Sequence, residues 1–338
     1  MQGYDSLGGF EAFRRYSDFF VLRGYMKGKW LGLYVPGVPP KKVIVSVIQG
    51  AMQPAAVESR RKLLDSFCLA IAQTGYLYAS EEFQLFIRGR DTFEKETTRL
   101  PMPHLTQTRQ VYQVLFESEP DSTETASLSD FERRLIDTIA QAKHLKVKLK
   151  SLVQYHKGLE AAHHQLAEGV RTFEASVYSQ YAETPNYRVV KTAVSEASSP
   201  FQVLRDWAAW EYVEVTSMLE GIQARNLLIS QRDRADRRRI DLKKHISKRQ
   251  KGKRSFFSFR KKRTTEELEA DLQTIEREIA DLAVICTLSE RWMLRHQIPL
   301  FKVQRAAAYQ SAVRAFAGDM VPASHFLLQS FASMNQLV

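Results

Sequence analysis

The chain lacks the residues and motifs on which several protein classes depend. It has only two cysteines in 338 residues, and because neither has a CxxC partner we expect buried free thiols rather than a disulfide framework or a zinc site. A Gly-rich phosphate loop, a GxSxG elbow and an HExxH motif are missing, which argues against the enzymes built on them. No apolar run approaches the roughly 18 residues of a membrane-spanning helix, and the first residues do not resemble a signal peptide. The expected protein is cytosolic and is not an enzyme, with neither cofactor nor metal.

Acidic residues are outnumbered by basic ones, 38 against 49, and the formal net charge is +11. Such a balance favours an anionic partner, which can be nucleic acid, a membrane surface or a phosphorylated ligand. The excess is local, because residues 232–263 hold sixteen Lys or Arg and three Asp, a balance of +13. Subtracting +13 from +11 leaves −2 for the remaining chain.

The spacing of apolar residues divides the chain into three parts. Residues 1–92 mix short apolar runs with a proline-rich loop and one helical pattern, which predicts an α+β unit. Residues 93–128 are rich in Pro, Ser, Thr and Asp and show no long apolar face, so we expect a linker. In residues 129–338 apolar side chains recur every three or four positions, which predicts three long coiled-coil helices.

Local signals mark where these long helices begin and bend. Ser199 and Pro200 suit the start of the second helix. Thr264 with Glu267 forms a capping-box pattern at the start of the third, and Pro299 is predicted to kink it. A long, narrow bundle buries little core per residue, so we expect a dimer in which a partner bundle covers the remaining apolar stripe.

The basic excess is predicted to lie at the turn between the second and third helices. The turn reads KRSFFSFRKK, which places aromatic rings among cations. Three interpretations stay open: a tip that enters acidic lipid, a surface that stacks on nucleic-acid bases, and a solvated loop without a partner. The tip residues are Lys253, Arg254, Phe256, Phe257, Phe259, Arg260, Lys261 and Lys262.

Near the N-terminus, the stretch FRRYSDF raises the question of why adjacent arginines stand among apolar residues. A guanidinium fork suits a phosphate, and a tyrosine ring can pack beneath the apolar face of an inositol. A lysine after a rigid proline turn adds a point charge, and an arginine on a helix can close the other side. Arg14, Arg15 and Tyr16, with the later Lys41 and Arg60, could therefore build a phosphoinositide pocket.

Four segments carry a family resemblance. RRYSDF (14–19), VPGVPPKK (35–42) and ESRRKLLDSF (58–67) resemble the signature segments of PX domains. The segment SPFQVLRDWAAWEYVEVTSMLEGIQARNLL (199–228) resembles the second helix of a sorting-nexin BAR domain. Together they resemble a PX-BAR sorting nexin of the type that works with retromer. The fold so implied is an α+β PX domain, a small antiparallel sheet plus helices, followed by an all-α BAR domain of three long helices.

The resemblance also implies roles for the pocket residues. Arg15 would grip the 3-phosphate, Tyr16 would pack under the ring, Lys41 would contact the linking phosphate, and Arg60 would bind ring hydroxyls. The implied lipid is phosphatidylinositol 3-phosphate. Only thirteen residues precede Arg14, so we expect an N-terminally shortened sheet with an open edge.

The implied function is a membrane-shaping adaptor for intracellular protein transport, peripheral on endosomal membranes that contain phosphoinositide. Its expected partners are a second copy or another sorting nexin, and the retromer core. The candidate contacts on its concave face are Arg237, Arg238, Lys243, Lys244 and Lys248. The alternatives are a coiled-coil scaffold whose basic 232–263 stretch binds nucleic acid or a partner protein, and a cargo adaptor that has lost lipid binding.

Overall fold

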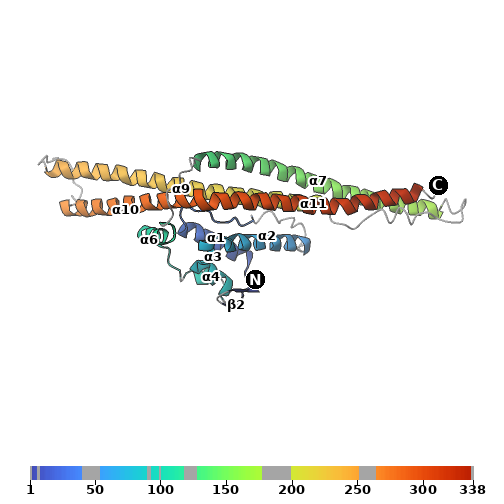
Figure 1. Ribbon diagram of the computed structural model, residues 1–338, viewed down its shortest axis with the longest axis horizontal. Helices are drawn as coiled ribbons and strands as arrows, with labels where there is room; N and C mark the ends of the chain where they lie inside the picture. Colours follow the sequence, from blue (N-terminus) through green and yellow to red (C-terminus); the bar gives the residue numbers. More distant parts are fainter. Residues whose placement is uncertain are drawn as a thin grey trace. The chain divides into compact units, whose positions relative to one another are not determined.

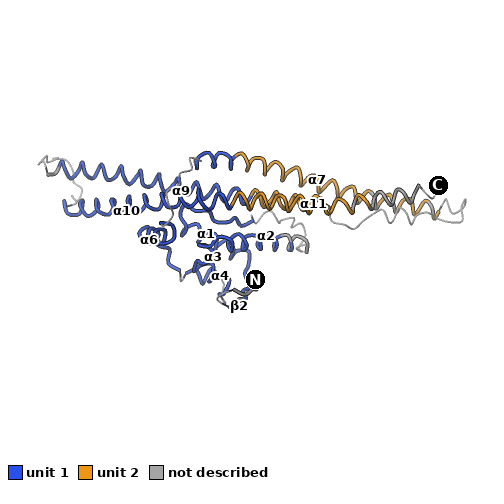
Figure 2. Tube along the Cα trace, in the orientation of Figure 1, with its two compact units in different colours: residues 1–136, 213–300 blue, residues 137–212, 301–338 orange. Residues whose placement is uncertain are grey.

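The computed structural model describes residues 2–5, 8–39, 54–89, 93–98, 100–117, 128–176, 199–250 and 264–335 (Figure 1). The chain forms two compact units (Figure 2). The first comprises Met1–Ile136 with Val213–Leu300, and the second comprises Asp137–Tyr212 with Phe301–Val338. Among the helices in these ranges, none combines the length and the hydropathy that a membrane span requires.

The first unit begins with the small antiparallel sheet and short helices that were predicted. Strands β1 (Gln2–Asp5) and β2 (Gly8–Glu11) pair antiparallel, with Gln2 opposite Glu11. The helices that follow are α1 (Tyr16–Lys29), α2 (Pro54–Ala72), α3 (Gly75–Tyr78), α4 (Glu81–Arg88), α5 (Phe93–Thr97) and α6 (Leu105–Phe116). Ser80 caps α4, because its hydroxyl accepts the amide hydrogen of Phe83.

A cluster of aromatic rings forms the core between α1, α2, α4 and α5. Phe86 packs edge-on against Phe19 and Phe93, with ring centroids 5.0 Å apart in both pairs. Phe67 of α2 contacts Phe19 at 6.0 Å. These rings are almost fully buried, and edge-to-face pairs add stability beyond their buried area.

Arg14, which the sequence grouped with the pocket residues, is instead part of this core and does not face solvent. Its guanidinium donates hydrogen bonds to the carbonyls of Leu85, Phe86 and Gly89 at 3.1, 2.7 and 2.9 Å. It also pairs with the carboxylate of Glu96 at 3.1 Å, and the two side chains are only 1% and 6% exposed. The Leu85 carbonyl also accepts the Gly89 amide hydrogen at 2.7 Å. A cation at the C-terminal end of α4 adds donors for the last carbonyls and complements the helix dipole.

Helices α5 and α6 both lie inside the stretch predicted to be a linker. The apolar face of α6 is short, but Tyr112 and Phe116 are almost fully buried. The Tyr112 hydroxyl donates to the carbonyl of Leu31 at 2.8 Å. Arg109 pairs with Asp281 of α10 at 3.1 Å. Residues 105–116 are therefore a packed helix, and the domain limits proposed around them remain predictions.

The long helices confirm the all-α prediction for the rest of the chain. They are α7 (Leu128–Ser176), α9 (Phe201–Gln250), α10 (Thr265–Trp292) and α11 (Ile298–Asn335). The predicted capping box of α10 is present: Thr264 Oγ accepts the Glu267 amide hydrogen at 3.1 Å, and Glu267 accepts the Thr264 amide hydrogen at 2.8 Å.

A π-helical turn, Met293–Gln297, joins α10 to α11. It ends two residues before Pro299, which cannot donate a hydrogen bond to the carbonyl four residues earlier and whose ring would clash with it. A wider π-turn relieves this conflict, so the predicted kink at Pro299 takes the form of a change in helical hydrogen bonding.

In the second unit, α7, α11 and the start of α9 share a core. Trp207 and Tyr309 lie with ring centroids 5.1 Å apart, and Phe201 lies 5.5 Å from Phe316. Arg305 of α11 pairs with Glu211 of α9 at 3.4 Å. From α7 the core receives Ala142, Leu149 and Val153.

The two adjacent arginines at the start of α1 make a matched test of this fold. Arg14→Met is expected to lower the free energy of unfolding by about 3–5 kcal/mol, because it leaves the Glu96 carboxylate buried without its cation. Arg15→Met is expected to change it little, because Arg15 is exposed. Urea denaturation of both variants measures this, and equal effects would contradict the buried role of Arg14.

Candidate functional site

The structure brings two of the four predicted pocket residues into contact. Tyr16 is the first residue of α1, and the guanidinium carbon of Arg60, on α2, lies 5.3 Å from the centroid of its ring. The Tyr16 hydroxyl donates to the carbonyl of Pro39 at 2.5 Å. The tyrosine ring is therefore held between a cation on one helix and the end of the proline-rich segment.

Arg60 keeps a donor without an acceptor among the described residues. Its Nε–H is buried and makes no hydrogen bond to another described residue. A buried donor left unsatisfied costs about 1–3 kcal/mol, so an acceptor supplied by a ligand would stabilise this arrangement. Burial raises the pKa of Tyr16, although the Arg60 guanidinium acts in the opposite direction. Tyr16 therefore stays a neutral ring and hydrogen-bond donor at physiological pH.

The other two predicted pocket residues are Arg15 and Lys41. Arg15 lies at the N-terminus of α1, where its backbone N–H donates to the Asp18 carboxylate at 2.8 Å and its side chain is exposed. Arg15 directly precedes Tyr16 in the chain, and its exposed side chain can contact a ligand from solvent. Lys41 lies outside the described residues. The arrangement of Arg15, Tyr16 and Arg60 offers two cations and an aromatic face, which suits a phosphorylated ring.

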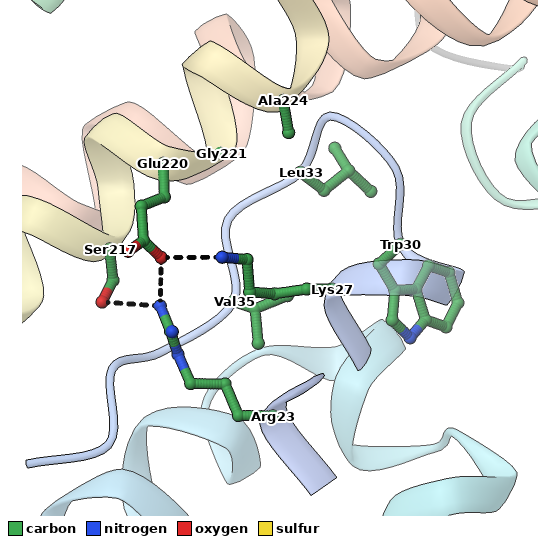
Figure 3. A pocket seen from close by; sticks show the side chains of 9 residues that line it. All are labelled: Arg23, Lys27, Trp30, Leu33, Val35, Ser217, Glu220, Gly221 and Ala224. Carbon is green, nitrogen blue, oxygen red and sulfur yellow. Dashed lines mark hydrogen bonds and ion pairs between the residues drawn. The ribbon is translucent and has the colours of Figure 1, made fainter. Parts of the chain in front are cut away.

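A second cluster, which the sequence analysis missed, joins α1 to α9. Arg23 and Lys27 of α1 both bind the Glu220 carboxylate, at 2.6 and 3.1 Å, and Arg23 also donates to Ser217 Oγ at 3.0 Å (Figure 3). These ion pairs cross a small pocket. Its lining residues are Arg23, Lys27, Trp30, Leu33, Val35, Ser217, Glu220, Gly221 and Ala224. Because the charged side chains of this pocket pair with one another, we interpret it as a structural contact rather than a ligand site. We call the ion pairs of Arg23 and Lys27 with Glu220 the α1–α9 joint.

The five basic residues of α9 that were predicted for a concave face divide into two groups. Arg238 pairs with Glu278 at 3.1 Å and Lys243 pairs with Glu276 at 2.8 Å, so these two connect α9 to α10. Arg237, Lys244 and Lys248 are exposed and share one face of α9, since they are spaced by seven and four residues. Lys244 lies 3.8 Å from Asp241 in a solvent-exposed pair, which is a weak interaction. The predicted tip residues, from Lys253 to Lys262, lie outside the described residues.

Comparison with known proteins connects this geometry to a family. Residues 4–90 match the PX domain family model. The chain is 32% identical over 87 residues to sorting nexin-17 of Pongo abelii. The matched region is 26% of this chain and 17% of that protein. It is 35% identical over 78 residues to sorting nexin-30 of Xenopus tropicalis, which covers 23% of this chain and 17% of that protein. The chain thus matches only about a sixth of the length of these relatives.

A solved structure extends the likeness of the fold to almost the whole chain. The structure of the SNX-BAR Mvp1 tetramer, determined by cryo-EM, matches with a TM-score of 0.54. The match covers 93% of this chain and 88% of that chain at 13% sequence identity. At this identity the likeness concerns the fold alone, and it confirms the prediction of a PX domain followed by a helical BAR domain.

The ion pairs of the α1–α9 joint predict that the free energy of unfolding depends on pH. Burial alone would raise the pKa of Glu220, but Arg23 and Lys27 outweigh it and hold the pKa below its usual range. The stabilisation is therefore complete above the unfolded-state pKa of about 4.3 and is lost as the pH falls through the lower folded-state value.

Glu220→Gln is accordingly expected to lower the thermal midpoint at pH 7. The difference from the unsubstituted protein should shrink as the pH falls below about 4.3 and vanish below the lower folded-state pKa of Glu220. Thermal unfolding at several pH values measures this. Glu269→Gln, at an exposed carboxylate of α10, serves as the control. A difference that persists unchanged in acid would show that the Glu220 charge does not contribute.

Proposed function

From the PX-BAR sorting nexin architecture of this chain, we propose that it binds a phosphoinositide head group with its PX domain and membranes with its helical part. The proposed lipid is phosphatidylinositol 3-phosphate. The proposed role is that of a peripheral adaptor on endosomal membranes in intracellular protein transport. A second copy of this chain or another sorting nexin, and the retromer core, are the proposed partners.

The packing of the Arg60 guanidinium on the Tyr16 ring, with the exposed Arg15 directly before that tyrosine in the chain, is the observation that carries the proposal. The Arg60 Nε–H is buried and has no acceptor among the described residues. An inositol ring placed on Tyr16 would bring its hydroxyls to Arg60 and its 3-phosphate to Arg15. The free donor would then gain an acceptor, and a guanidinium fork would bind a phosphate.

An apolar stripe on α7 supports dimerisation. Five large apolar side chains recur every seven residues and are each between 39% and 61% exposed: Leu145, Leu152, Leu159, Leu166 and Phe173. A heptad repeat places them along one line of the helix, which is the geometry that a second helix covers. We propose that a partner of the same fold buries this stripe.

The exposed cations of α9 would add attraction without head-group selectivity. Arg237, Lys244 and Lys248 share one face, and each cation near anionic lipid contributes about 1 kcal/mol. A dimer presents every site twice, so avidity raises the affinity for a membrane even where one pocket binds weakly. Selectivity would come from the pocket, and overall strength from the charge and the dimer.

Adjacent arginines on α2 provide a matched test of the pocket. Arg60→Met is expected to weaken binding to vesicles with phosphatidylinositol 3-phosphate by about tenfold, because a charge-assisted hydrogen bond is lost. Arg61→Met should leave binding unchanged, because the Arg61 side chain is 66% exposed and pairs with Glu58, away from the Tyr16 ring. Co-sedimentation at fixed total anionic charge measures both.

Binding of both variants to vesicles with generic acidic lipid should persist. If the two substitutions reduce selective binding equally, the pocket is not at Arg60. If nucleic acid competes for all binding with a steep salt dependence, the basic stretch at 232–263 carries a scaffold function instead.

Dimerisation has a separate test on α7. Leu152→Asp is expected to weaken self-association at least about tenfold, because a carboxylate would be buried in the apolar contact. Gln154→Asp adds the same charge two residues away, on roughly the opposite side of the helix, and should have little effect. Sedimentation velocity over a range of concentrations measures both, and a dimer that survives Leu152→Asp would place the contact elsewhere.

A further inference from the structure

Residues 34–39 link the α1–α9 joint to the Tyr16 pocket, because the segment contacts Arg23 at Pro36 and Tyr16 at Pro39. All six of its residues are buried. It follows the turn after α1 and reaches Pro39, whose carbonyl accepts the Tyr16 hydroxyl. Any displacement of this segment would therefore move the group that fixes the pocket tyrosine.

Glu214 of α9 holds the middle of this segment. Its carboxylate is buried and accepts hydrogen bonds from the Tyr34 hydroxyl and from the Gly37 amide, the latter at 3.3 Å. A buried carboxylate needs such donors, because an unpaired charge in the interior is costly. Glu214 and this backbone segment therefore stabilise each other.

Direct contact keeps the segment against α9. A Cβ atom added at Gly37 would lie 2.3 Å from Val213 Cγ1 and 2.5 Å from Ser217 Oγ, which no real structure tolerates without a shift. Glycine at this position allows the backbone to approach the helix that closely. The position of the segment is thus set by α9 as well as by the helices of the PX domain.

Arg23 adds a second connection between the same parts. Its Nε donates to the carbonyl of Pro36 at 2.8 Å, and its terminal nitrogen binds Glu220 and Ser217 of α9 (Figure 3). One guanidinium therefore joins α1, the proline-rich segment and α9. A planar fork with several donors suits this role better than a lysine would.

We infer that Glu214 and Glu220 of the BAR helix α9 are positioning residues for the head-group pocket of the PX domain. They act through the segment 34–39 and touch neither Tyr16 nor the lipid. The inference rests on the proposed function and adds that the helical domain sets the affinity of the lipid pocket. By linkage, head-group binding must also stabilise the contacts of α9.

The experiment uses the full chain and the soluble head group inositol 1,3-bisphosphate, which removes membrane charge and avidity from the measurement. Glu220→Gln and Glu214→Gln keep the side-chain shape and remove the charge. Each is expected to weaken head-group binding about five- to tenfold by calorimetry. Gln223→Ala, at an exposed position of α9, should bind like the unsubstituted protein.

Hydrogen exchange on the unsubstituted chain gives a readout that a purely structural role would not move. Addition of the head group should slow amide exchange in residues 213–221 of α9 as well as in 34–39. Unchanged exchange at 213–221, or unchanged affinity of both glutamine variants, overturns the inference and leaves the pocket intact. Loss of affinity only in proportion to a fall in the thermal midpoint also overturns it.

An Arg15→Ala variant separates this inference from the proposed function. If the unsubstituted chain binds the head group and Arg15→Ala does not, the pocket is established and the glutamine variants decide the inference alone. If the unsubstituted chain does not bind the head group, the proposed function fails, and the inference fails with it.

Discussion

The carboxylate of Glu214 is the constraint on which much of the first unit depends. It is buried on a helix that belongs by sequence to the C-terminal domain, yet its donors come from residues near the N-terminus. Hydrogen bonds from Tyr34 and Gly37 stabilise a carboxylate in this position, and they require both residues to stay against α9. The PX domain is consequently packed against α9 of its own chain, and the segment 34–39 contacts both.

Much of the fold could be predicted, because long helices leave a periodic signal and caps leave a local one. The capping box at Thr264 and the proline effect at Pro299 involve only neighbouring residues, and the structure has both. Helix α6 could not be found in this way. Its short apolar face acquires meaning only from distant partners such as Leu31 and Asp281.

The candidate site shows the same limit at single residues. Arg14 and Arg15 are adjacent and chemically identical, and no local pattern tells which one is buried; the contact with Glu96 decides it. Tyr16 and Arg60 were found because their types and order suggest a phosphate site. Glu220 was missed, because a glutamate on a helix normally faces solvent, and its partner Arg23 lies almost two hundred residues away in sequence.

The most direct test of this account is a structure of the full chain with inositol 1,3-bisphosphate bound. The account predicts a phosphate on Arg15, the inositol ring on the face of Tyr16, and a ring hydroxyl within hydrogen-bond distance of Arg60 Nε, with segment 34–39 still against Glu214. A head group bound instead among the exposed cations of α9, with Arg60 Nε still unsatisfied, would contradict it.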